Sequence, residues 1–209
     1  MSQKDNRMQV KVVAICGSLR KDSYTRRILE IALNSARENG AYTELIDLRS
    51  YDLVFFDEDG KDDYPADVER LRTTVRSAHG ILLGTPEYHG GISGVLKNAI
   101  DLMGFTEFEG KMLGLLGVSG GQLGALNALN SLRTIGRNLH AWVLPQQISM
   151  PEAWKAFDEE GNIKSPALKK RVEEMGMLIT QFATLHELQN HKEFVEMWQR
   201  LAINPGGTK

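Results

Sequence analysis

Apolar residues follow two different spacings along the chain, and their alternation predicts strands followed by helices. Residues 10–16 form a largely β-branched run that is apolar apart from Lys11, which is typical of a strand buried on both faces. Apolar residues at helical spacing then begin at Ile28 and stop before Gly40, so we expect a helix over about 24–39. The same succession of a short apolar run and a periodic segment repeats to about residue 188.

Five strands and five helices are predicted in this way. The strands are expected at about 10–16, 42–48, 80–84, 112–118 and 142–148, the last one interrupted or ended by Pro145. The helices are expected at about 24–39, at 65–78, at 95–103, from the loop 119–121 to 139, and at 166–188, with a continuation or a separate short helix at 186–201.

This alternation favours a parallel sheet with right-handed crossovers and helices on both faces. The predicted fold class is α/β, a flavodoxin-like, doubly wound sheet of five parallel strands in the order 2-1-3-4-5. The length of 209 residues suits a single domain, 1–209. We expect its core at about 10–188 and a C-terminal helical extension at about 186–209.

Composition narrows the functional classes. A net charge of -2 and a pI near 6.2 give no electrostatic reason to expect nucleic acid or an anionic membrane as a partner. No apolar run is long enough for a transmembrane helix, and residues 1–7 lack the apolar core of a secretory signal. The single cysteine, Cys16, ends an apolar strand and is interpreted as a core residue. We therefore expect a cytoplasmic protein, and the histidine spacings predict no metal site.

The loop after the first strand carries the most distinctive chemistry. Residues 17–25 place glycine, serine, threonine and arginine between a buried strand and a helix. The unpaired amides at a helix N-terminus and the helix dipole both favour an anion, and Arg20 adds a positive charge. A phosphate group fits such a place, although a Gly-Ser turn before a helix is also an ordinary cap.

Two further loops are expected at the same edge of the sheet. In the strand order 2-1-3-4-5, the loops after strands one, three and four lie side by side. Residues 85–94 combine a proline, an aromatic ring and several glycines, and the glycines of 119–124 allow a ligand to approach the backbone closely. Each loop alone would suit a plain connection, but together the three fit one ligand with a phosphate, a polar linker and a flat ring.

Three motifs in order along the chain resemble the NADPH-dependent FMN reductase family. They are Gly17-Ser-Leu-Arg-Lys-Asp-Ser-Tyr-Thr25, Pro86-Glu87-Tyr88-His89 and Gly94-Val-Leu-Lys-Asn-Ala-Ile-Asp101, and the resemblance spans about residues 10–143. The family includes flavin, quinone, azo-dye and chromate reductases of flavodoxin-like fold. The resemblance implies bound FMN, NADPH or NADH as electron donor, a small-molecule acceptor, and a homodimer or homotetramer.

The resemblance also implies which residues bind the cofactor. The motif expected at the FMN phosphate contains Ser18, Arg20, Ser23, Tyr24 and Thr25. The residues expected to line the isoalloxazine ring, largely through backbone N–H groups, are Pro86, Glu87, Tyr88 and His89, with Ser119, Gly120 and Gly121 on its other side. Thr25 and His89 stand where the family often has asparagine. No catalytic side chain is expected, because the flavin carries the chemistry.

The predicted reaction is a ping-pong cycle. NAD(P)H would give a hydride to flavin N5 and leave, and a quinone, a free flavin, an azo compound or a metal oxyanion would then take the electrons from the same face. Two alternatives remain open, namely a flavodoxin-like electron carrier and a non-enzymatic flavin-binding sensor or interaction module. The carrier is disfavoured because flavodoxin phosphate loops have no arginine like Arg20, and a Rossmann dehydrogenase because the first turn lacks Gly-x-Gly-x-x-Gly.

Subunit contacts are a further expectation. Lys97 and Asp101 lie four residues apart on a predicted helix and suit either a surface ion pair or a subunit interface. The irregular segment 149–165 contains Trp154 and Phe157, which either mark an interface or pack under a loop.

Overall fold

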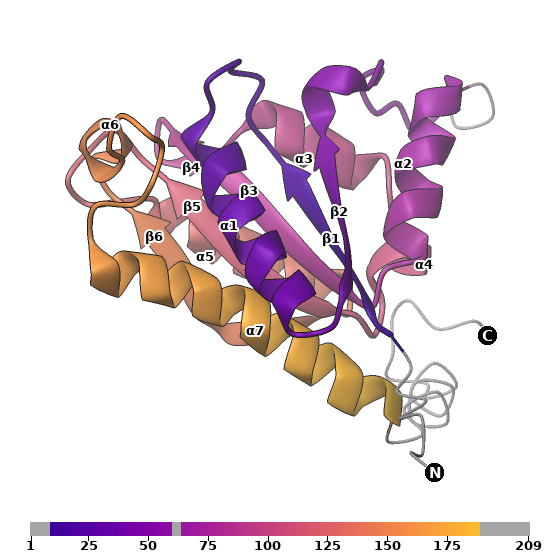
Figure 1. Cartoon of the computed structure of the whole chain (residues 1–209). Coiled ribbons are helices and arrows are strands. Elements are labelled where there is room, and N and C mark those ends of the chain that lie inside the picture. The colour runs from indigo at the N-terminus through magenta and orange to yellow at the C-terminus, as the bar shows by residue number, and fades with distance from the viewer. Residues whose placement is uncertain (1–8, 60–63, 189–209) are drawn as a thin grey trace, which may run out of the picture.

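The computed structural model describes residues 9–59 and 64–188, and Figure 1 shows a twisted sheet with helices on both faces. The strands are β1 (Lys11–Cys16), β2 (Tyr42–Asp47), β3 (Gly80–Tyr88), β4 (Gly91–Ile92), β5 (Met112–Val118) and β6 (Trp142–Met150). All but β4 run parallel in the order β2-β1-β3-β5-β6, and β4 pairs antiparallel with β3. The predicted doubly wound, flavodoxin-like α/β sheet is confirmed, with one short strand added.

The helices form one layer on each face of this sheet. They are α1 (Tyr24–Glu38), α2 (Ala66–Arg76), α3 (Gly94–Asp101), α4 (Phe105–Phe108), α5 (Leu126–Asn138), α6 (Ala153–Ala156) and α7 (Pro166–Leu188), with a 3-10 turn η1 at Leu48–Ser50. Helices α1 and α7 pack against each other on one face, and α2, α3 and α5 cover the other (Figure 1).

The two faces of β1 explain the apolar run that follows Lys11 at residues 12–16. Val12 and Ala14 point into the core under α1 and α7, whereas Val13 and Ile15 point into the core under α2, α3 and α5. Successive side chains of a strand alternate between its faces, so a strand covered on both sides needs an apolar residue at every position.

The third strand differs from its prediction. We expected a strand at 80–84 and a loop from Pro86 to Gly94, but β3 continues to Tyr88 and returns as β4. His89 and Gly90 form the two-residue turn, with φ values of 51° and 77°. Turns of this kind match the twist of a hairpin, but the sequence lacks the Asn-Gly pair that usually signals one.

The region around the fifth helix differs in a similar way. Helix α5 begins at Leu126 rather than directly after the loop 119–121, because Gly124 adopts φ 72°, which is not helical. A Cβ at Gly124 would also lie 2.2 Å from Ser149 Oγ. Strand β6 continues through Pro145, with a shift of register opposite Leu113 and Leu115. Strand β6 ends the order of the described sheet, and an edge position tolerates proline.

Two short helices, α4 and α6, were not predicted. The final helix has its expected bounds, but its predicted continuation to residue 201 and most of the extension at 186–209 lie outside the described residues. In the part of the chain that the structure describes, no helix combines the length and apolar character needed to span a bilayer.

Candidate functional site

The carboxyl ends of three neighbouring strands bring the predicted loops to one edge of the sheet. Cys16 of β1 pairs with Gly84 of β3, which pairs in turn with Leu116 of β5. The loop at 17–23, the β3–β4 hairpin and the loop at 119–125 therefore begin side by side (Figure 1). This is the edge at which ligands bind in doubly wound sheets.

Loop 17–23 begins with a glycine that no other residue can replace without movement. The Gly17 amide donates to the Gly84 carbonyl at 2.8 Å, and a Cβ at Gly17 would lie 2.7 Å from Leu96 Cβ. The chain then turns into the polar part of the loop, where Ser18 is 4% exposed and its Oγ accepts a hydrogen bond from the Arg20 amide at 3.4 Å. A tight turn thus holds a hydroxyl and a backbone amide close together.

The first turn of α1 closes this loop. Ser23 caps the helix, its side-chain oxygen accepting from the Arg26 amide at 3.2 Å, and no acidic residue stands in the first turn. Arg26 reaches back to the Lys21 carbonyl and to Asp47 at 3.2 Å, which fixes the loop against the end of β2. Arg20 is exposed and Thr25 is buried. The electrostatics at this helix end favour an anion.

Cys16 lies directly beneath the loop. Its thiol is fully buried and donates to the Ser18 carbonyl at 3.8 Å. Burial raises the pKa of this thiol above its ordinary value, so the sulfur stays protonated and weakly reactive. The interpretation of Cys16 as a core residue is confirmed.

In the β3–β4 hairpin, Glu87 is expected to line the ring, but its side chain binds to helix α5. A carboxylate oxygen of Glu87 accepts from the Ala128 amide at 3.0 Å, in the first turn of α5. The N-cap of that helix, Ala125, has no capping side chain of its own, so Glu87 supplies the cap and joins the hairpin to α5. Pro86 is buried and Tyr88 is 51% exposed.

Ser93 is an important residue that the predicted site set lacks. Its hydroxyl donates to the Gly17 carbonyl at 2.6 Å and accepts from the Leu96 amide at 3.2 Å, and its own amide donates to Thr85 Oγ1 at 3.1 Å. Ser93 therefore caps α3 and ties the hairpin to loop 17–23. A serine directly before a predicted helix is an N-cap signature, so the sequence did contain a signal for it.

The loop at 119–125 presents bare backbone to the solvent. Ser119 Oγ accepts from the Gly121 amide at 3.0 Å, and a Cβ at Gly120 would meet no atom within 4 Å. Gly120 and Gly121 are both exposed. The loop is anchored to the end of β6, since the Ser119 amide donates to the Met150 carbonyl at 2.9 Å.

A cavity of about 500 Å³ adjoins the start of α1. Its lining includes Tyr24, Arg27, Trp154 and Phe157. Phe157 is only 6% exposed and stacks on Tyr24, whereas Trp154 is 60% exposed. Of the two aromatic residues considered for a subunit contact, Phe157 thus packs inside the described chain.

Two other expectations concern charged groups. Lys97 Nζ lies 2.6 Å from a carboxylate oxygen of Asp101, which confirms the predicted ion pair on α3. Within residues 9–59 and 64–188, no three histidine, cysteine, aspartate or glutamate side chains gather in a way that would hold a metal ion. The described site thus offers hydrogen-bond donors, the positively charged side chain of Arg20 and exposed backbone without side chains.

Comparisons with known proteins agree with this arrangement. Residues 10–155 match the model of a family described as NADPH-dependent FMN reductase. The chain is 32% identical over 189 residues to the NADPH-dependent FMN reductase ArsH of Shigella flexneri, covering 88% of this chain and 72% of the relative. It is 33% identical over 155 residues to an FMN-dependent NADPH-azoreductase of Staphylococcus saprophyticus, covering 72% and 82% of the two chains.

A solved structure shows the same likeness. The flavoenzyme FerB, an NAD(P)H:acceptor oxidoreductase from Paracoccus denitrificans, aligns with a TM-score of 0.68 and 25% identity, covering 85% of this chain and 98% of the other. The region that matches the family model includes all three loops at the candidate edge and ends two residues before Phe157.

Proposed function

Because the chain belongs to the NADPH-dependent FMN reductase family, we propose that it transfers electrons from NAD(P)H through bound FMN to a small-molecule acceptor. The observation that carries this function is the meeting of a phosphate-suited helix N-terminus and two open loops at one sheet edge. FMN, when bound, supplies the ring that accepts and releases the electrons.

Loop 17–23 and the start of α1 fit the phosphate of FMN. The Ser18 oxygen already accepts a hydrogen bond from the Arg20 amide, which leaves its O–H to donate to a phosphate oxygen. Arg20 contributes the charge, and Ser23 and Thr25 stand where the first amides of α1 lack intrahelical acceptors. Tyr24 belongs to the same turn, as the first residue of α1.

The hairpin and the loop at 119–125 fit a flat ring. The Glu87 carboxylate is engaged at α5, so Glu87 would serve the ring through its backbone, together with Pro86, Tyr88 and His89. On the other side, Ser119 and the side-chain-free Gly120 and Gly121 leave room for close approach. Backbone N–H groups of these residues would favour negative charge on a ring bound beside them.

The surroundings of this edge favour apolar, flat acceptors. Leu19, Tyr88 and Leu123 are 53%, 51% and 88% exposed on the three loops. We propose quinones and azo compounds as the preferred acceptors within a wider set that includes free flavin and metal oxyanions. Donor and acceptor use the same open face in turn, which is a ping-pong order of binding.

A homo-oligomer is part of the proposal. Phe55 is 89% exposed, and its neighbour Phe56 is fixed on α3, since the Phe56 amide donates to Asn98 Oδ1 at 2.9 Å. The Asn98 side chain also donates to the Val54 carbonyl at 2.9 Å. An ordered, exposed apolar segment on a helix suits a contact between copies, in a homodimer or homotetramer.

The test starts from the visible spectrum of the purified protein. We expect a yellow protein whose flavin absorbance bleaches under anaerobic NADPH or NADH and returns when a quinone is added. Initial rates at several fixed quinone concentrations should give parallel double-reciprocal lines, as ping-pong order requires. Flavin that binds but is reduced by neither nicotinamide would favour the electron-carrier or sensor alternative.

A further inference from the structure

The segment 149–157, called here the bridging segment, contacts the candidate loop at 119–125 and the start of α1. At its first end it is hydrogen-bonded to the loop at 119–125. Ser149 Oγ accepts from the Ala125 amide at 2.9 Å, and the Met150 carbonyl accepts from the Ser119 amide at 2.9 Å. These bonds fix the loop that would border the flavin ring.

Two more hydrogen bonds strengthen this end. The Glu152 amide donates to the Gly121 carbonyl at 3.1 Å, and the Ala153 amide donates to the Ser119 carbonyl at 3.0 Å. Glu152 adopts φ 42°, which is unfavourable for a residue with a side chain, so its surroundings hold the backbone in place. The bridging segment is therefore an ordered part of the site edge.

At its other end, the bridging segment packs on the first residue of α1. The rings of Phe157 and Tyr24 stack with centroids 5.4 Å apart and planes 9° apart. The Arg27 guanidinium lies 5.6 Å from the centroid of Phe157 and 5.7 Å from that of Tyr24. Phe157 is held in turn by a β-bridge to Ile163. Tyr24 thus rests on a fixed surface.

We propose that Phe157, acting through Tyr24, is a positioning residue that raises the affinity of this protein for FMN relative to riboflavin. The inference rests on the proposed function, because it takes loop 17–23 and the start of α1 as the phosphate site. Tyr24 stands between Ser23 and Thr25, so the stack sets where both of these residues lie. Contacts to a phosphate depend on that placement, whereas contacts to the ring at the other loops do not.

The test compares the dissociation constants of FMN and riboflavin, which differ only in the phosphate. Phe157→Leu removes the ring but keeps apolar bulk, and it should weaken FMN binding by up to about tenfold, the full energy of an aromatic pair, with riboflavin binding little changed. Phe157→Tyr keeps the stack and should keep the ratio of the two constants. Trp154→Leu is the matched control, since Trp154 lies in the same segment, is exposed, and should leave the ratio unchanged.

A second variant reaches the same contact from α1. Tyr24→Leu should lower the ratio as Phe157→Leu does, and the double variant should lose little more than either single one, because both remove one contact. Thermal unfolding shows which variants fold. If Phe157→Leu does not fold, Tyr24→Leu alone tests the stack.

Three outcomes would overturn the proposal. Equal loss of FMN and riboflavin affinity would mean that Phe157 only supports the fold. An unchanged ratio in both Phe157→Leu and Tyr24→Leu would mean that the stack does not position the phosphate. A wild-type protein that binds FMN and riboflavin equally would overturn the phosphate assignment itself, and this inference with it.

Discussion

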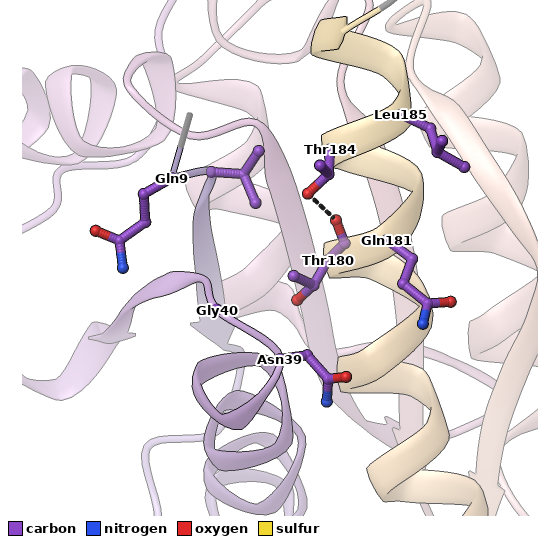
Figure 2. Close-up of a pocket in the computed structure, with 8 residues that line it drawn as sticks. Gln9, Asn39, Gly40, Thr180, Gln181, Thr184 and Leu185 are labelled. Atoms are coloured by element: carbon purple, nitrogen blue, oxygen red, sulfur yellow. Dashed lines mark hydrogen bonds between the residues drawn. The ribbon is translucent and has the colours of Figure 1, made fainter. Parts of the chain in front are cut away.

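The two ends of α1 both border hollows in the surface, yet only one end suits an anion. At its N-terminus stands loop 17–23, which suits an anion, next to the cavity beside Tyr24, whose lining carries Asp158, Glu159 and Glu160 as well as Arg27 and Lys164. At its C-terminus a larger cavity, about 800 Å³, opens between α1, the start of β1 and α7 (Figure 2). The described residues that line it are Gln9, Val10, Asn39, Gly40, Thr180, Gln181, Thr184 and Leu185, none of which carries a charge.

Polar side chains at the C-terminal cavity donate hydrogen bonds to backbone carbonyls of their own helices. The Asn39 side chain donates to the Ser35 carbonyl at 2.8 Å, and Thr184 donates to the Thr180 carbonyl at 2.8 Å (Figure 2). Carbonyl oxygens and the negative end of the dipole face this side, so an anion is disfavoured there. Volume and helix polarity thus favour opposite ends of α1, and the proposed phosphate site follows the polarity.

The strongest test of this comparison is Arg20→Ala. If Arg20 is the charged hydrogen-bond partner of the phosphate, as proposed, its removal should weaken FMN binding by about ten- to a hundredfold and leave riboflavin binding little changed. Gln181→Ala, in the larger cavity at the other end of α1, should change neither. Fluorescence titration of both flavins measures the effects, and unchanged FMN affinity in Arg20→Ala would remove loop 17–23 as the phosphate site.

Gly17, in the loop before α1, and Gly40, just after its C-terminus, allow effects on stability to be distinguished from effects on FMN binding. Gly17→Ala places a Cβ 2.8 Å from the Gly84 carbonyl as well as against Leu96, and should cost about 1–3 kcal/mol of unfolding free energy by overpacking. Gly40→Ala has open space but a φ of 95°, and should cost about 1–2 kcal/mol through the left-handed backbone.

Only Gly17→Ala should also weaken FMN binding, because it displaces the loop that is proposed to hold the phosphate. Urea unfolding gives the stability change and flavin titration gives the affinity. Equal FMN affinity in the two variants would show that the edge at Gly17 is no closer to the cofactor than the edge at Gly40.

The sequence predicted the parallel strands and the loops at 17–25 and 119–124 because these features have local causes, whereas most of the expected loop at 85–94 is a hairpin. Strand β5 has its predicted bounds, since a continuous apolar run between polar turns leaves little choice. The phosphate-suited loop also has a local signature, a glycine after a buried strand followed by hydroxyls and an arginine.

Features that depend on contacts distant in sequence were not predicted. Phe157 meets Tyr24 across 133 residues (157 − 24), and the Ser93 hydroxyl meets the Gly17 carbonyl across 76. Nothing near Phe157 distinguishes a ring that packs from one that is exposed, and nothing near Glu87 shows that α5 lacks a capping side chain. Such pairs become visible only when the sheet has brought the loops together.

The response of stability to pH should differ between the two edges. Burial raises the pKa of the Cys16 thiol, so above its ordinary value of 9.0 the unfolded chain ionises first and stability should fall as the pH rises. Burial lowers the pKa of His186, at the opposite edge, so below its ordinary value of 6.5 the unfolded chain takes up the proton first and stability should fall as the pH decreases.

Urea unfolding between pH 5 and 10 measures both slopes. Cys16→Ala should flatten the alkaline slope and leave the acidic slope unchanged. His186→Gln should flatten the acidic slope and leave the alkaline slope unchanged. An alkaline slope that persists in Cys16→Ala would mean that another group causes it.

The smallest expected effect again comes from one residue at each edge. His89 and His140 both adopt left-handed backbone, with φ values of 51° and 57°, where asparagine is more favourable. His140 also contacts Glu109 at 3.2 Å and packs on Phe105, so His140→Asn should lose more in contacts than it gains in backbone energy. The ring of His89 makes no such contact within residues 9–59 and 64–188. His89→Asn should therefore raise stability by less than about 1 kcal/mol.

The same substitution decides how His89 serves the flavin. If only the backbone of His89 approaches the ring, His89→Asn keeps both the turn and the FMN dissociation constant, because asparagine supports the same conformation. A rise in that constant, without a loss of stability, would show instead that the imidazole contacts the cofactor. Thermal unfolding and FMN titration of the two asparagine variants, measured side by side, distinguish a residue chosen for its backbone from one chosen for its ring.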